Sequence, residues 1–498
     1  MSDVAQDPVN QNNQNKKDTQ PISKLKLTFC GGVGSVTGAN FLLEGPIAGH
    51  VGGNDTGSKT FAPGVARIIV DCGIEQGTHD SDENNEKDFI YNPADIDVAL
   101  ITHAHMDHIG RIPKLMKDGF RGTIYSTPET KALSVYMLDD ALKIMTQNAL
   151  KSHSEPLYVA ADVDKAFSHW KTIPYHQETE LFPGYSVNLK DSGHVLGSTM
   201  YKLTYTAEGE DKKRVVMFTG DLGNSPTPLL RDTESIAGTD YLLMESVYGD
   251  KNHEDRDTRL KKLIDVLKRN YEQKGVLLMP IFSLEKTQEI LFEIHRLMDQ
   301  GALPKMHMYL DSPLAIKLTD VYEKMSKDFN DSAENEIHKG HDIFSFPGLT
   351  IIGSAEESKT IRDVPGPKVI MAGSGMSNGG RIQHHEINYL GDPNNTIVFL
   401  GYQAVGTLGR AIMEGAKEVM IHDQKVHVKA RIEHIDGYSS HKDSDHLIEF
   451  VEEIADHVKK VFVVMGETKS SLFLVQRLRD YLGVNATHPE EGQSVFLD

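Results

Sequence analysis

The chain is poor in the features that mark secreted or membrane-bound proteins. Its 498 residues include only two cysteines, Cys30 and Cys72, so we expect no disulfide framework and predict a reducing location, the cytoplasm. No apolar run reaches the length of about 20 residues that a membrane-spanning helix needs, so no membrane partner is expected. Residues 1–22 are rich in Asn, Gln, Asp and Lys and lack the apolar centre of a signal peptide, which predicts a disordered tail.

Positive charge is also scarce. The sequence has 52 Lys and Arg residues against 72 Asp and Glu residues, which gives a formal net charge of −20. This balance opposes broad, non-specific attraction to nucleic acid, because the phosphate backbone is itself negative. It leaves room for a local basic groove, or for phosphate binding that a metal assists.

The hydrophobic pattern divides the rest of the chain into three blocks, as expected for a length beyond one usual core. Residues 23–248 contain mainly short strands. Residues 249–429 alternate short apolar strands with segments of helical spacing, which predicts a parallel sheet covered by helices. Residues 430–498 contain a helix, a strand and a second helix.

The strongest chemical signal is the run His-Ala-His-Met-Asp-His at the end of a predicted strand. His103 and His105 are two residues apart on an extended segment, so both rings project to one side and can bind one metal ion. Asp107 and His108 follow on the turn and can reach a second ion. Imidazole and carboxylate ligands suit zinc, which keeps an open position for water in catalytic sites. A surface histidine cluster is the alternative, but this spacing favours metal binding.

Two further residues complete a pattern that neither would indicate alone. His194 lies between glycines and Asp221 follows a predicted strand, so each by itself would be an ordinary turn residue. Together they supply a third imidazole and a carboxylate that can bridge two metal ions. In order and spacing, these residues and the histidine run resemble the metallo-β-lactamase superfamily.

Other motifs narrow the resemblance to the β-CASP nucleases of that superfamily. They occur in family order and extend the similarity over nearly the whole chain, except the tail and residues 45–64. The motifs are residues 245–249 (Glu-Ser-Val-Tyr-Gly), 309–313 (Tyr-Leu-Asp-Ser-Pro), 372–376 (Ala-Gly-Ser-Gly-Met), 379–381 (Gly-Gly-Arg), 401–409 (beginning Gly-Tyr-Gln) and 438–443 (Tyr-Ser-Ser-His-Lys-Asp).

The resemblance implies both a fold and a set of ligands. Residues 23–248 and 430–498 would form a metallo-β-lactamase αββα sandwich, and residues 249–429 an inserted β-CASP α/β domain with a mainly parallel sheet. The cofactor would be zinc at two sites. The implied ligands are His103, His105 and His194 at the first site, Asp107 and His108 at the second, and Asp221 as the bridge between them.

The resemblance also implies roles in catalysis and substrate binding. Glu245 matches an acidic residue that hydrogen-bonds a histidine, and His441 matches that histidine, a candidate general acid for the leaving oxygen. Asp107 and Asp221 complete the implied catalytic set. Loops with free N–H groups can bind phosphate oxygens, and the implied substrate-binding residues are Ser312, Ser374, Gly375, Met376, Arg381 and Ser440.

Two positions depart from the family pattern. Lys286 stands where the family usually has Arg, so the positive charge is kept but the planar guanidinium group, which can form two parallel hydrogen bonds, is lost. Met465 stands where the RNA-cleaving members carry His, the last ligand of the second zinc. A thioether is a poor zinc ligand beside hard carboxylates, so we expect a weakened second site.

These observations favour a zinc-dependent ribonuclease that hydrolyses single-stranded RNA in RNA processing or decay. A DNA nuclease of the same family is the first alternative, because its DNA-processing branch also lacks the histidine that Met465 replaces. A weakly active RNA-binding paralogue is the second, although the retained ligand set opposes it. A small-molecule thioester or lactam hydrolase would not need an insert of roughly 180 residues. Exonuclease and endonuclease modes stay open, and a homodimer is compatible with the sequence.

Overall fold

The computed structural model describes residues 24–47, 64–77, 80–207, 209 and 211–498. The predicted disordered tail and most of the segment 45–64 therefore lie outside the described part of the chain. Within the described residues, no helix combines the length and the apolar character that crossing a membrane would require.

Two seven-stranded sheets are built from the two ends of the chain. The first has the order β22-β1-β2-β3-β4-β5-β6, antiparallel from β22 to β3 and parallel from β3 to β6. Its strands are β1 (Leu25–Gly31), β2 (Asn40–Pro46), β3 (Val65–Val70), β4 (Val98–Leu100), β5 (Thr123–Ser126), β6 (Trp170–Thr172) and β22 (Ser494–Leu497).

The second sheet has the order β21-β20-β11-β10-β9-β8-β7 and is parallel from β21 to β10 and antiparallel from β10 to β7. Its strands are β7 (Thr179–Phe182), β8 (Tyr185–Asp191), β9 (Thr199–Thr206), β10 (Lys213–Phe218), β11 (Tyr241–Met244), β20 (Lys460–Val463) and β21 (Ala486–Thr487).

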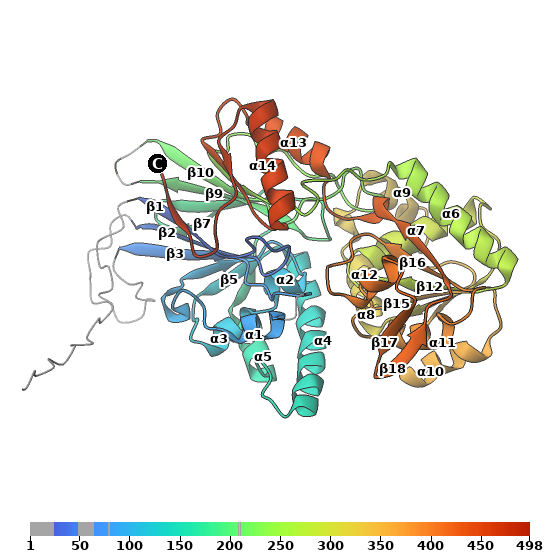
Figure 1. The fold of residues 1–498 in the computed structure, drawn as a ribbon. Helices are drawn as coiled ribbons and strands as arrows, with labels where there is room; N and C mark the ends of the chain where they lie inside the picture. The colour runs from blue at the N-terminus through green and yellow to red at the C-terminus, as the bar shows by residue number, and fades with distance from the viewer. Residues whose placement is uncertain (1–23, 48–63, 78–79, 208, 210) are drawn as a thin grey trace, which may run out of the picture.

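Buried side chains of the two sheets meet in one apolar cluster, to which Phe29 and Ile68 come from the first sheet and Leu203 and Phe462 from the second. The opposite face of the first sheet packs on α3, α4 and α5, and the opposite face of the second packs on α13 and α14 (Figure 1). The helices of this part are α1 (Ser81–Glu86), α2 (Met106–Ile109), α3 (Ile112–Lys117), α4 (Pro128–Ser152), α5 (Ala160–His169), α13 (Ser444–Glu452) and α14 (Thr468–Leu482), with 3-10 turns η1 (Pro93–Asp95) and η4 (Asp436–Tyr438).

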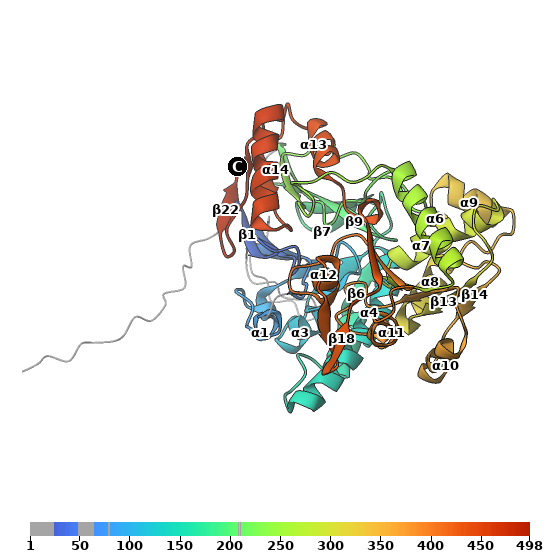
Figure 2. The ribbon, with the colours of Figure 1, turned by 45° about the vertical axis from the view of Figure 1, so that its right-hand side comes forward.

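The middle of the chain forms a separate six-stranded sheet, ordered β14-β13-β15-β12-β16-β19, in which every pairing is parallel. It stands beside the first part in both views (Figures 1 and 2). The strands are β12 (Val276–Pro280), β13 (His307–Asp311), β14 (Leu349–Ile351), β15 (Lys368–Ala372), β16 (Thr396–Leu400) and β19 (Arg431–Ile435), with a small hairpin of β17 (Glu418–Ile421) and β18 (Gln424–His427).

Helices cover both faces of this sheet, as strand–helix alternation predicted. They are α6 (Arg256–Gln273), α7 (Lys286–Asp299), α8 (Pro313–Lys324), α9 (Asp331–His338), α10 (Ala355–Thr360), α11 (Arg381–Tyr389) and α12 (Leu408–Met413), with 3-10 turns η2 (Ser326–Asp328) and η3 (Ile361–Asp363).

The sheet of the inserted part continues past one expected boundary. We expected the inserted part to end at Lys429, but β19 pairs in parallel with β16 and so extends that sheet to Ile435. The physical reason is that β19 is an edge strand whose sequence, Arg-Ile-Glu-His-Ile, is only partly buried. It therefore lacks the continuous apolar run that indicates a central parallel strand.

The two parts of the molecule share one apolar cluster. Ala104 and Val195, which neighbour predicted metal ligands, pack in the same cluster as side chains of α7 and α8. A backbone contact adds to this, because the Asn330 amide donates to the Leu229 carbonyl at 2.9 Å. The loops that carry the predicted site are thus supported from both sides.

Candidate metal centre

Four of the predicted ligands converge where the ends of three strands meet. His103 and His105 follow β4, His194 lies between β8 and β9, and Asp221 follows β10. One ligand atom from each of the four lies within 4.8 Å of the others. Nε2 of His103 and Nε2 of His194 are 3.5 and 3.4 Å from Oδ2 of Asp221.

Burial sets the protonation of this group. It is the main cause that lowers the pKa of His105 to about 3 and the pKa values of His103 and His194 well below the usual range. Burial opposes the charge of Asp221, but the neighbouring His108 and His103 keep its pKa well below the usual value. Neutral imidazoles around a carboxylate are the state that metal binding requires.

His108 stands beside this group. Its Nε2 lies 3.4 Å from Oδ1 of Asp221 and 3.9 Å from Oδ2 of Asp107, and this buried atom has no hydrogen-bond partner in the described structure. Burial opposes charge on the ring, but Asp221, Asp71 and Asp107 raise the pKa of His108 well above its usual value. Two carboxylates, those of Asp221 and Asp107, near a nitrogen without a hydrogen-bond partner fit a bound cation.

The second group of ligands is less convergent than the first. Among the described residues, neither Asp107 nor His108 belongs to a set of three ligand atoms that lie within 4.8 Å of one another. This difference is consistent with a second site that holds metal less firmly.

Asp71, directly after β3, is a residue of this site that we did not predict. Its Oδ1 accepts the backbone N–H of Thr102, and its Oδ2 accepts the Thr102 hydroxyl and lies at Nδ1 of His108, each at 2.8 Å. In the sequence, the sign of this role was an acidic residue directly after a buried strand. Such a carboxylate fixes the ring proton on Nδ1 and turns Nε2 toward the ligand side.

Met465 lies just beyond β20 and is 1% exposed. Its side chain packs in the apolar cluster between the two sheets. Its backbone has a left-handed φ of 48° and is held at both ends: the amide donates to Gly32 at 2.7 Å and the carbonyl accepts from Ser246 at 3.3 Å. Met465 therefore fills core space between the two sheets.

His441 and Glu245 form a hydrogen-bonded pair next to the four converging ligands. Nδ1 of His441 lies 3.1 Å from both carboxylate oxygens of Glu245, which also accepts the Leu222 N–H at 2.5 Å. The ring of His441 is centred 4.7 Å from that of His194. Burial opposes protonation of His441, but Glu245 and Asp221 raise its pKa to about 9. A charged imidazole is thus held next to the cluster.

Comparisons with known proteins agree with this geometry. The Beta-Casp domain family matches residues 287–412, a Metallo-beta-lactamase superfamily domain matches residues 62–217, and the Zn-dependent metallo-hydrolase RNA specificity domain matches residues 425–489. The ribonuclease TTHA0252 of Thermus thermophilus is 34% identical over 411 residues, which cover 82% of this chain and 90% of that protein. The chain belongs to the β-CASP family.

A more distant relative is the transcription termination factor FttA of Methanosarcina mazei, which is 29% identical over 467 residues, 90% of this chain and 68% of that protein. The family assigned from the motifs is confirmed. So is the enzyme class, a metal-dependent hydrolase of mixed α/β architecture with metallo-β-lactamase and β-CASP domains.

The predicted substrate residues of the β-CASP domain lie at the carboxyl edge of its sheet. Ser312 follows β13 and Ser374 follows β15. The hydroxyl of Ser312 is 3.2 Å from that of Ser283, whereas the buried Ser374 hydroxyl has no partner in the described structure. Ligands of open parallel sheets bind at this edge. The guanidinium of Arg381, in contrast, is already paired with Asp311.

The loop after β16 joins this edge to the metallo-β-lactamase part. Gln403 donates from Nε2 to the carbonyl of Gly375 at 3.0 Å, and Gly409 donates from its amide to the carbonyl of Met376 at 2.9 Å. The hydroxyl of Tyr402 donates to Glu467, two residues beyond Met465, at 2.6 Å. The predicted residues Gly375 and Met376 are thus fixed through their carbonyls, and their loop connects to the metallo-β-lactamase part.

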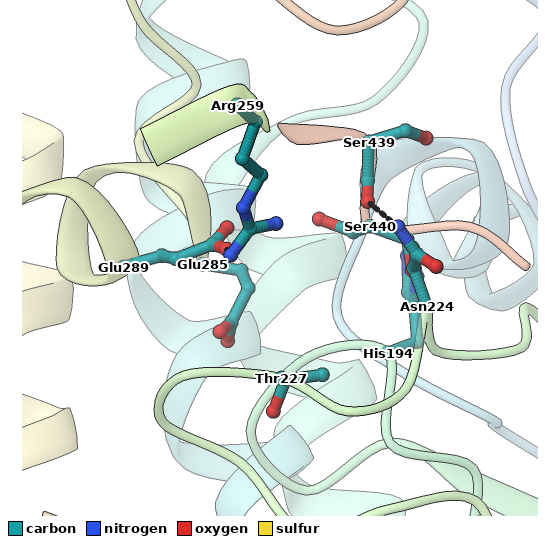
Figure 3. A pocket seen from close by; sticks show the side chains of 8 residues that line it. All are labelled: His194, Asn224, Thr227, Arg259, Glu285, Glu289, Ser439 and Ser440. Atoms are coloured by element: carbon teal, nitrogen blue, oxygen red, sulfur yellow. Dashed lines mark hydrogen bonds and ion pairs between the residues drawn. The ribbon is translucent and has the colours of Figure 1, made fainter. Parts of the chain in front are cut away.

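A small pocket opens between the two domains beside His194 (Figure 3). Ser440, the last predicted substrate residue, lies on its wall and accepts the Nδ1–H of His194 at 3.2 Å through its carbonyl. This bond leaves Nε2 of His194 for the cluster. The pocket is lined by His194, Asn224, Thr227, Arg259, Glu285, Glu289, Ser439 and Ser440.

Proposed function

We propose that the chain is a zinc-dependent ribonuclease that hydrolyses phosphodiester bonds of single-stranded RNA, in RNA processing or decay. The observation that carries the proposal is the convergence of His103, His105, His194 and Asp221 next to a β-CASP domain. The match to an RNA specificity domain over residues 425–489 supports RNA as the polymer. The relative named a ribonuclease, which aligns over most of its length, supports the same choice.

Zinc is the metal that we propose. Three neutral imidazoles and one carboxylate form the first donor set, and Asp107, His108 and the shared Asp221 form the second. Nitrogen-rich ligand sets favour zinc over magnesium or calcium, which take oxygen ligands. When bound, zinc would act as a Lewis acid on the phosphodiester and activate water for attack.

The protein's own contribution to bond cleavage is proton transfer. We propose that His441 donates a proton from Nε2 to the leaving oxygen, while Nδ1 stays paired with Glu245. The raised pKa keeps the ring protonated near neutral pH, as a general acid requires. Glu245 is buried and acts through His441, because it holds the ring in position and favours its charged form.

The substrate path that we propose runs between the two domains. Ser312, Ser374 and the N–H groups near Gly375 and Met376 would bind the backbone phosphates, since hydroxyl and amide donors face the edge of the sheet. Arg381, which is paired with Asp311, would contribute to the electrostatic field that the RNA meets at this edge. Ser440 would line the substrate path beside His194. We further propose that the two seven-stranded sheets form the αββα sandwich of the superfamily, and that the chain acts in the cytoplasm.

A DNA nuclease of the same family is the second candidate. The observation that favours it is Met465, which packs in the core at the position where RNA-cleaving relatives are expected to carry a histidine ligand.

Cleavage of matched polymers by protein of measured zinc content tests the proposal. End-labelled single-stranded RNA and DNA of the same sequence would be incubated with the zinc-loaded protein, with chelator-treated protein, and with treated protein after zinc is returned. We expect RNA to be cut and DNA to be cut far more slowly, with activity lost on chelation and restored by zinc. Faster cutting of DNA would establish the second candidate. RNA binding without turnover at full zinc loading would contradict both.

A further inference from the structure

A second group of side chains of metal-ligating types lies in the β-CASP domain, at the end of α7. His295 and Asp299 are four residues apart on α7, so both side chains project from the same face of that helix. His341 follows α9 in a turn that packs beside them. One ligand atom from each of the three lies within 4.8 Å of the others.

The tautomer of His295 is fixed by a backbone group. Its Nδ1–H donates to the carbonyl of Ser345 at 2.7 Å, and a carbonyl can only accept. Nε2 of the neutral ring therefore carries a lone pair. His295 is 8% exposed, and this buried Nε2 has no hydrogen-bond partner in the described structure.

Nε2 of His295 faces a carboxylate with which it does not form a hydrogen bond. Oδ2 of Asp299 lies 3.3 Å away, but the atoms are not aligned for a hydrogen bond. At this distance the lone pair of a neutral ring and a carboxylate oxygen repel each other, so the pair is stabilised only by a proton on the ring or by a bound cation. A buried atom without a partner calls for such an explanation.

The ring of His341 is also held through its Nδ1. Its Nδ1 pairs with Oε2 of Glu336 at 2.9 Å, which leaves Nε2 as the nitrogen that is open to a metal. Histidine ligands of protein metal sites usually have their other ring nitrogen bound to a carbonyl or carboxylate, because this contact orients the ring and makes it more basic. Both histidines of this group have such a contact.

We propose that His295, Asp299 and His341 form a zinc site separate from the catalytic centre. Two imidazoles and one carboxylate suit a borderline divalent cation with water as the fourth ligand, whereas calcium and magnesium prefer oxygen ligands. The site is remote from the interdomain pocket, since His295 lies ten residues along the chain from Glu285, or about 15 Å of helix. Bound zinc ties the last turn of α7 to the segment after α9.

His341→Ala is the main test variant, because His341 is exposed and its removal leaves the core unchanged. His338→Ala is the matched control: it removes an exposed histidine three residues earlier in the same region. Asp299→Asn, also at an exposed position, removes the carboxylate but keeps its shape. Wild-type protein and all three variants would be loaded with excess zinc and dialysed together, and zinc per chain and RNA cleavage would be measured.

We expect His341→Ala to hold one zinc fewer than the wild type, and Asp299→Asn to bind that zinc at least about tenfold more weakly, with cleavage unchanged in both. His338→Ala should match the wild type. Added zinc should raise Tm less in His341→Ala than in the wild type or in His338→Ala. Equal zinc content in the wild type and His341→Ala, or an equal zinc-dependent rise in Tm, would overturn the proposal.

Discussion

The substitution Asp71→Asn tests whether Asp71 sets the tautomer of His108 that can bind metal. The amide oxygen of Asn would keep the bond from the Thr102 N–H that Oδ1 of Asp71 accepts at 2.8 Å, so its NH2 group would face Nδ1 of His108. An NH2 group donates, so Nδ1 would have to accept, and the ring proton would move to Nε2. Nε2 is the atom that faces Asp221, and a protonated nitrogen cannot bind zinc.

The size of the effect follows from the contact that is lost. A buried hydrogen bond to a charged group contributes roughly 1.5–3 kcal/mol. That energy corresponds to a loss of about 10- to 100-fold in zinc affinity, the range typical of residues that orient metal ligands. The fold should lose little, because the shape of the side chain and the Thr102 contact are retained. The first site should be affected less, since Asp71 reaches its ligands only indirectly, through the Thr102 hydroxyl that lies 3.1 Å from Nδ1 of His103.

Zinc competition with a chromogenic chelator, combined with RNA cleavage at low and at saturating zinc, measures this effect. We expect Asp71→Asn to retain the tighter zinc, to bind the weaker one 10- to 100-fold less tightly, and to regain cleavage at high zinc. Asp97→Asn is the control, because Asp97 accepts the Arg67 amide at 2.9 Å in the same sheet, away from the cluster. Wild-type affinity for both zincs in Asp71→Asn would refute the tautomer argument.

Four further predictions follow from the same geometry. Asp221→Ala should abolish cleavage, a loss of several kcal/mol in transition-state stabilisation, with an unchanged circular dichroism spectrum; near-wild-type turnover would refute the bridge. Met465→His should raise zinc content under identical dialysis, while zinc-free variant protein should melt lower because a buried imidazole lacks a partner. Affinity for single-stranded RNA should fall as salt rises, measured by fluorescence anisotropy, and a salt-independent affinity would contradict phosphate contacts. Burial raises the pKa of Glu285 from 4.5 to about 8, so between these pH values the folded chain keeps a proton that the unfolded chain releases, and the free energy of unfolding should fall as pH rises. In denaturant titrations, Glu285→Gln should remove up to about 5 kcal/mol of this fall. Glu356→Gln, at an exposed position, should leave the fall unchanged.

The strands and helices with continuous apolar patterns could be predicted from the sequence. β16 (Thr396–Leu400) and β11 (Tyr241–Met244) are buried along their whole length, and the apolar runs of such parallel strands are visible in the sequence. β19 could not be placed in the inserted sheet, since an edge strand carries mixed residues. Pairing between distant strands depends on tertiary packing, which local patterns do not encode.

The candidate metal ligands could be singled out in the sequence because their chemistry is unusual for their positions. His103 and His105 form a motif by themselves, and family order added His194 and Asp221. Asp71 could not be singled out, because an acidic residue after a strand is common and its role depends on the position of the His108 ring. Arg381 is the opposite case, because its motif indicated a role that the structure qualifies. The motif indicated substrate binding, but the structure shows that the guanidinium of Arg381 is already paired with Asp311.

β19 has a consequence for how the enzyme can be controlled. His441 lies six residues beyond Ile435, the last residue of that strand, but its segment is held by the metallo-β-lactamase part. Nδ1 of His441 contacts Glu245, and the Asn224 amide donates to the Ser440 carbonyl. A swing of the β-CASP domain would therefore leave the proposed acid beside the candidate metal ligands and would change only the width of the substrate path. A protein or small molecule bound between the domains would then hinder RNA binding and leave the proton-transfer geometry unchanged.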